Sequence, residues 1–115
     1  MKKIFASAAV LFFAAISCNA FAGGDIEAGK AAARNCAACH GADFKTPIDP
    51  TYPKLAGQHA DYIAHALTAY KRGGEGANGR NNAIMGAQAK PLSDKDIQDI
   101  AAYIQSLPGS LVVSK

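Results

Sequence analysis

The chain has 115 residues, of which 50% are apolar and 18% are charged. This length suits one small domain and is too short for two, and the apolar share argues against a largely disordered chain. A formal charge of +3 does not supply the concentrated basic face that nucleic-acid binding needs. We therefore expect no nucleic-acid partner.

The N-terminal segment resembles a secretory signal peptide. Lys2 and Lys3 precede an uncharged apolar stretch, residues 4–16, and Ala20-Phe21-Ala22 offers a small-residue cleavage site. The apolar stretch is shorter than the roughly 20 residues that a membrane-spanning helix needs. We predict cleavage after Ala22 and a periplasmic mature chain, residues 23–115, that forms one domain and does not span the membrane.

A second processing route starts from Cys18. Residues 15–18, Ala-Ile-Ser-Cys, loosely resemble a lipoprotein signal, although Ala15 stands where such signals usually carry Leu. Cleavage after Ala22 instead removes Cys18 and the two N-terminal lysines, which lowers the formal charge from +3 to +1. The mature chain then keeps two cysteines, Cys36 and Cys39, and one methionine, Met85.

The mature sequence predicts three main helices and no strand, an all-α fold. The first helix begins at an N-cap, Asp25, and runs to about residue 35. The second covers about residues 58–71 and carries a 3.6-residue apolar stripe. The third follows Ser93, which with Asp96 resembles a capping box, and ends at Leu107-Pro108-Gly109.

Two irregular segments separate these helices. Residues 41–57 carry three prolines and are expected to form an extended loop. Residues 73–82 carry four glycines and lead into Ala83-Ile84-Met85-Gly86. We expect residues 83–86 to be mobile enough to place Met85 over a cofactor.

The most specific motif is Cys36-Ala37-Ala38-Cys39-His40, the Cys-x-x-Cys-His pattern of covalent haem c attachment. Near the end of a helix, thiols three residues apart face the same side, so each can add to one haem vinyl group. The next residue, His40, can then bind the iron through an imidazole nitrogen. We predict one haem c held by thioethers to Cys36 and Cys39.

Two other interpretations of the cysteine pair compete with haem. A thioredoxin-like redox site would require a βαβ pattern, which the flanking sequence lacks. A zinc site would require further thiolate or imidazole ligands, and no second cysteine pair supplies them.

A proximal histidine leaves the sixth iron position to be assigned. Met85 is the candidate because no other thioether remains after cleavage, and a methionine ligand suits electron transfer. The competing interpretation is that Met85 fills the core. His59 and His65 are rival ligands, and either one alone could reach the iron and give bis-histidine ligation. Both together cannot, because six residues apart on a helix they do not converge on one metal. An open sixth position would instead suit gas binding or catalysis.

With these features the chain resembles the class I cytochromes c. Two segments make the resemblance more specific. They are residues 52–63, Tyr-Pro-Lys-Leu-Ala-Gly-Gln-His-Ala-Asp-Tyr-Ile, and Pro91-Leu92-Ser93-Asp94 leading into residues 100–104. They resemble the small bacterial cytochromes c-553 and one half of the two-haem cytochromes c4. The resemblance implies a class I cytochrome c fold, with three main helices and loops wrapped around one haem.

The resemblance also implies roles for individual residues. His40 and Met85 would be the axial iron ligands, and the carbonyl of Pro53 would accept a hydrogen bond from the other ring nitrogen of His40. Gly29 and Tyr103 would mark the crossing of the first and last helices. Gln88 departs from the pattern, since relatives often carry a second methionine there.

The predicted function is one-electron transfer through His/Met-ligated iron, without an enzymatic activity. Its partners would be redox proteins that dock transiently on a monomer or weak dimer. Tyr52, Gln58 and Arg80 are candidate partners of the haem propionates or ordinary surface residues. The alternatives are a ligand-binding or catalytic haem protein with an open or labile sixth position, and a fixed electron-entry subunit of an oxidase or reductase complex.

Overall fold

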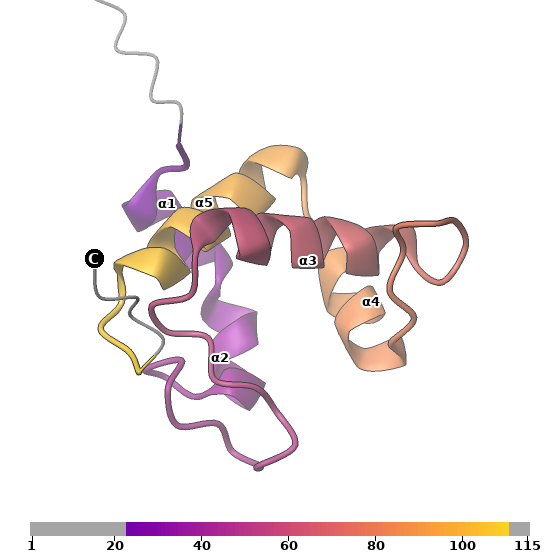
Figure 1. Cartoon of the computed structure of the whole chain (residues 1–115). Coiled ribbons are helices and arrows are strands. Elements are labelled where there is room, and N and C mark those ends of the chain that lie inside the picture. Colours follow the sequence, from indigo (N-terminus) through magenta and orange to yellow (C-terminus); the bar gives the residue numbers. More distant parts are fainter. Residues whose placement is uncertain (1–22, 111–115) are drawn as a thin grey trace, which may run out of the picture.

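The computed structural model describes residues 23–110. The predicted signal peptide, residues 1–22 with Cys18, lies outside the described residues. Within the described range all regular structure is helical, as predicted (Figure 1), and no helix there has the length and apolar character to cross a membrane. The five helices are α1 (Ile26–Ala32), α2 (Arg34–His40), α3 (Ala60–Arg72), α4 (Ala83–Ala89) and α5 (Asp94–Ser106).

The first helical region is longer than predicted. The Asp25 side chain caps α1 by accepting a hydrogen bond from the Ala28 N–H at 2.9 Å. The prediction that the helix ends near residue 35 was wrong, because after a break at Ala33 the chain continues as α2 to His40. No helix-breaking residue lies in this stretch, and α2 ends where Gly41 adopts a φ of 89°.

Helix α4 was not predicted. The sequence led us to expect a mobile segment around Met85, whereas residues 83–89 form a short helix capped by Asn82. A helix of 7 residues is too short to show a clear apolar period. The predicted three main helices therefore become five, with α2 and α4 as the additions.

The two longest helices agree with prediction within two residues at each end. Helix α3 spans Ala60–Arg72, and Gly73, with a φ of 75°, caps its C-terminus. The capping box that opens α5 is complete, since the side chains of Ser93 and Asp96 each accept a hydrogen bond from the other residue's backbone.

Helix α5 is the centre of the fold and packs along both α1 and α3, while α4 packs against α3 (Figure 1). Gly29 marks the crossing of α1 and α5, because a Cβ built there would lie 1.9 Å from the carbonyl oxygen of Asp99 and 2.9 Å from the Cβ of Tyr103. The predicted crossing of the first and last helices is thus confirmed. Only glycine permits so close an approach.

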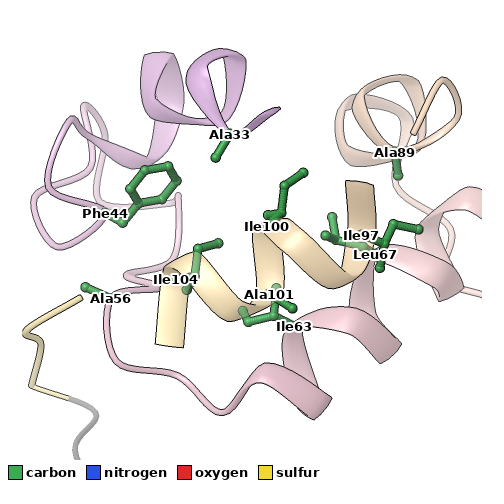
Figure 2. Packing of buried hydrophobic residues seen from close by; sticks show 10 residues of the cluster. All are labelled: Ala33, Phe44, Ala56, Ile63, Leu67, Ala89, Ile97, Ile100, Ala101 and Ile104. Carbon is green, nitrogen blue, oxygen red and sulfur yellow. The ribbon is translucent and has the colours of Figure 1, made fainter. Parts of the chain in front are cut away.

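The buried apolar cluster lies around α5 (Figure 2). Phe44 joins it from the loop after α2, with its ring edge-on to Tyr103 at a centroid distance of 5.9 Å. The members of the cluster are Ala33, Phe44, Ala56, Ile63, Leu67, Ala89, Ile97, Ile100, Ala101 and Ile104.

Candidate functional site

Helix α2 carries the two thiols and the imidazole of the predicted haem site. Cys36 and Cys39 lie one turn apart, are partly buried and form no disulfide. Gly41 ends the helix in a buried turn, where an added Cβ would lie 2.1 Å from the carbonyl oxygen of Thr46. The chain therefore folds back immediately after His40.

His40 is held in one orientation. Its side chain is buried, with 5% of the residue exposed, and its Nδ1 lies 2.9 Å from the carbonyl oxygen of Pro53. A carbonyl can only accept a hydrogen bond, so Nδ1 carries the proton and the lone pair of Nε2 is free to bind a metal. The ring of Tyr52 meets the imidazole edge-on at 6.2 Å.

The loop after α2 positions Pro53 through backbone hydrogen bonds. The carbonyl of Phe44 accepts from the N–H groups of both Leu55 and Ala56, at 2.8 and 2.9 Å. Phe44 itself is buried and has a positive φ of 54°, which is uncommon for an aromatic residue. Leu55 and Ala56, which follow shortly after Pro53, are thus bonded to the backbone of a core residue.

Further hydrogen bonds tie this loop to α2. The N–H of Ile48 donates to the carbonyl of Cys39 at 3.1 Å. The carboxylate of Asp43 accepts from the N–H groups of Lys45 and Thr46, and these bonds lower the pKa of Asp43. The loop is therefore held close to the thiols and the imidazole.

The Cys36 thiol does not have the lowered pKa of a reactive redox cysteine. Burial raises the pKa of the Cys36 thiol, and the neighbouring Cys39 raises it further. Reactive redox cysteines need a lowered pKa. Residues 23–110 contain no cluster of three or more His, Cys, Asp or Glu side chains that could hold a metal ion.

Met85 comes from a different helix, α4, which follows α3 in the chain. It is the third residue of α4, its backbone N–H donates to Oδ1 of Asn82 at 2.9 Å, and its partly buried side chain packs against the core cluster. Helix α4 passes close to the end of α3, since a Cβ built on Gly86 would lie 3.7 Å from the carbonyl oxygen of Tyr70. Figure 1 shows α2 and α4 on the same side of α3.

The other predicted site residues lie in different surroundings. His59 and His65, the rival ligands, are both exposed. Gln58 accepts a hydrogen bond from the N–H of His59 at 2.9 Å. Arg80 lies against the rings of Tyr62 and Tyr70, at 5.6 and 5.4 Å from their centroids.

Asp99 is a buried charged residue that the sequence analysis missed. It is 4% exposed, accepts a hydrogen bond from the Asp25 N–H at 2.8 Å and pairs with Lys95 at 2.5 Å. The bond from Lys95 and then that from Asp25 lower the pKa of Asp99. The Lys95–Asp99 spacing of four residues on a helix was a visible signal, although it does not distinguish a buried pair from an exposed one.

Comparison with known proteins identifies the family. Residues 26–108 match the family model described as Cytochrome c. The chain belongs to the cytochrome c family. It is 41% identical to cytochrome c4 of Stutzerimonas stutzeri over 96% of this chain and 53% of that protein, and 39% identical to cytochrome c-553 of Helicobacter pylori over 93% of this chain and 99% of that one.

The fold of a solved relative agrees with this assignment. The crystal structure of reduced recombinant cytochrome c4 from Pseudomonas stutzeri matches with a TM-score of 0.68 and 43% identity, over 76% of this chain and 47% of that one. The chain therefore spans about half the length of cytochrome c4 and nearly all of cytochrome c-553. The predicted class I cytochrome c fold is confirmed.

The residues present fit covalently bound haem c, the cofactor of this family. Cys36 and Cys39 lie on one face of α2 in the Cys-x-x-Cys-His motif. Beside them stands a buried imidazole whose Nε2 is free to act as a ligand. These groups supply two thioether bonds and a nitrogen ligand.

Proposed function

We propose that this chain is a periplasmic monohaem electron carrier in which Cys36 and Cys39 hold the haem and His40 and Met85 bind its iron. The observation that carries the proposal is the fixed orientation of His40, buried one residue after Cys39 and bonded through Nδ1 to Pro53. An imidazole held in this way is prepared to ligate through Nε2.

When bound, the haem supplies a one-electron couple between ferric and ferrous iron. The chain's own residues tune and protect this couple. The Pro53 carbonyl holds the His40 ring in one orientation and one tautomer, and a methionine ligand raises the potential. Ligation by the same two residues, His40 and Met85, in both oxidation states would keep the structural change small when the electron moves.

The expected partners are redox proteins that dock briefly through small interfaces. After removal of the predicted signal peptide the formal charge falls from +3 to +1 with the loss of Lys2 and Lys3, so long-range steering by net charge is weak. The same processing would leave the chain without Cys18, the site of the alternative lipid anchor. We infer that the chain acts as a carrier and not as an enzyme.

A second candidate is a ligand-binding haem protein with a labile sixth position. The observation that favours it is the glycine-rich segment before α4, where Gly73 and Gly76 have positive φ and open space around them. Carbon monoxide added to the reduced native protein separates the two functions. An unchanged spectrum supports the carrier, whereas a rapid shift of the haem bands supports the labile site.

A third candidate, a fixed electron-entry subunit of a larger complex, differs in its assembly. Purification from native membranes and periplasm under mild conditions tests it. A monomer or weak dimer free of other chains supports the carrier, and a stoichiometric oxidase or reductase partner would overturn it.

A further inference from the structure

Arg80 makes a set of contacts that the iron site does not itself require. Its guanidinium lies 5.6 Å from the ring centroid of Tyr62 and 5.4 Å from that of Tyr70, within the range of cation–π attraction. It also donates a hydrogen bond to the Tyr62 hydroxyl at 3.5 Å. The backbone N–H of Arg80 donates to the carbonyl of Ala69 at 3.0 Å. All three partners belong to α3.

Gly73 begins the glycine-rich segment, residues 73–82, and is tied to α3 by its N–H, which donates to the carbonyls of Ala69 and Tyr70. Beyond Gly73 the segment has little besides Arg80 to hold it against α3. A Cβ built on Gly73 or Gly76 would meet nothing within 4 Å. Gly74 and Gly79 do have close neighbours, but these neighbours belong to the same segment. Within the described structure, the contacts of Arg80 are therefore the main ones that hold this segment against α3.

Arg80 lies shortly before α4, the helix that carries Met85. Asn82, two residues after Arg80, caps α4 by accepting from the Met85 N–H at 2.9 Å. Tyr70 lies next to both the glycine-rich segment and α4. Its ring faces Arg80, and its carbonyl oxygen lies 3.7 Å from the Cβ position of Gly86. A displacement of Arg80 would thus move the cap and the start of α4.

We propose that Arg80, held between Tyr62 and Tyr70, is a positioning residue that keeps Met85 on the iron. This inference rests on the proposed function, in which Met85 is the sixth ligand. Arg80 acts through the segment and α4, so its loss raises the fraction of molecules in which the methionine position is vacated. The planar guanidinium matters because it can stack on two rings at once, which the compact ammonium of lysine does not do.

Imidazole binding to the oxidised holoprotein measures that fraction directly. The apparent affinity of an added ligand is proportional to the population of the open state. We expect Arg80→Ala to raise the apparent affinity for imidazole about tenfold, the size expected from losing two exposed cation–π contacts. Arg80→Lys and Tyr62→Leu should each raise it several-fold, and Tyr62→Phe, which keeps the ring, should remain within about twofold of the parent.

Two matched controls separate positioning from other effects. Arg72→Lys changes an exposed arginine at the end of α3 and should leave imidazole affinity unchanged. Ser93→Ala removes the cap of α5 and should lower stability without raising imidazole affinity. If Ser93→Ala raises the affinity as much as Arg80→Ala does, general destabilisation explains the effect and the proposal is wrong.

The remaining outcomes are equally decisive. An affinity within twofold of the parent in Arg80→Ala would overturn the proposal, and if that variant does not fold, Arg80→Lys and Tyr62→Leu carry the test. Parent-like affinity in Arg80→Lys beside a large rise in Arg80→Ala would assign Arg80 a charge role, such as pairing with a propionate, and would also overturn it. If the parent lacks the sulfur-to-iron absorption band of a methionine ligand, the proposed function itself fails.

Discussion

At the residue scale, one backbone carbonyl determines how His40 can act. The hydrogen bond from Nδ1 to the Pro53 carbonyl leaves Nε2 as the nitrogen that is free to bind a metal, and the His40 residue as a whole is 5% exposed. Met85 is anchored differently, through its own N–H on Asn82 and the packing of α4 on α3. The two proposed ligands therefore respond to different changes in the chain.

Met85→Ala should leave the haem attached, because attachment depends on Cys36 and Cys39. The potential should fall, since loss of the thioether removes a ligand that favours ferrous iron, and external ligands such as carbon monoxide should bind. Redox titration and carbon monoxide binding of the purified holoprotein measure both effects. A variant with the parent's spectrum and potential would show that Met85 is not the ligand.

The candidate site could be predicted largely from sequence because its motif is local. Cys36, Cys39 and His40 lie within five consecutive residues, and Met85 stood out as the one methionine outside the predicted signal peptide. Asp99 could not be found in this way. Its burial depends on the crossing of α1 and α5, which joins residues 74 positions apart in the chain.

At the scale of elements, the crossing of α1 and α5 depends on Gly29. Gly29→Ala should destabilise the protein by about 1–3 kcal/mol, the usual cost of overpacking, because the new Cβ would overlap the Asp99 carbonyl. At an open helical position the same change stabilises by roughly 0.5–1 kcal/mol. The sign of the change, measured by denaturant unfolding, therefore tests the close approach.

Gly86→Ala is the matched control, since its added Cβ would meet the Tyr70 carbonyl at an ordinary contact distance of 3.7 Å. It should be neutral or stabilising by up to about 1 kcal/mol. Equal effects of the two substitutions would argue against a tight crossing at Gly29.

The helices differ in how well they could be predicted from the sequence. Helix α5 carries a capping box and a strong apolar period, so its start at Asp94 was predictable. Helices α2 and α4 have 7 residues each, and such short helices are stabilised mainly by tertiary packing. Their alanine-rich sequences were compatible with helix, but the contacts that stabilise them lie elsewhere in the chain.

At the scale of the whole molecule, stability should depend on pH through Asp99. Its pKa is lowered in the folded state by Lys95 and the Asp25 N–H, so the folded protein binds a proton there less readily than the unfolded chain does. The stabilising contribution is present above the ordinary carboxyl pKa of about 3.9. It is lost as the pH falls through the lower folded value.

Asp99→Asn should therefore be less stable than the parent near neutral pH and should lose less stability on acidification. Denaturant unfolding at about pH 7, 5 and 3 measures this difference. Asp61→Asn, at an exposed position in the first turn of α3, should follow the parent's pH dependence. Parallel curves for the parent and Asp99→Asn would show that Asp99 does not contribute to the acid sensitivity.

The whole account depends most on the iron ligands, and an absorption spectrum of the oxidised holoprotein tests them most directly. We predict a weak sulfur-to-iron charge-transfer band in the far red, and sharp low-spin bands of haem c after reduction. Haem bands without the far-red feature would contradict ligation by Met85 and favour an open or bis-histidine iron. A mature protein without covalently bound haem would contradict the central claim.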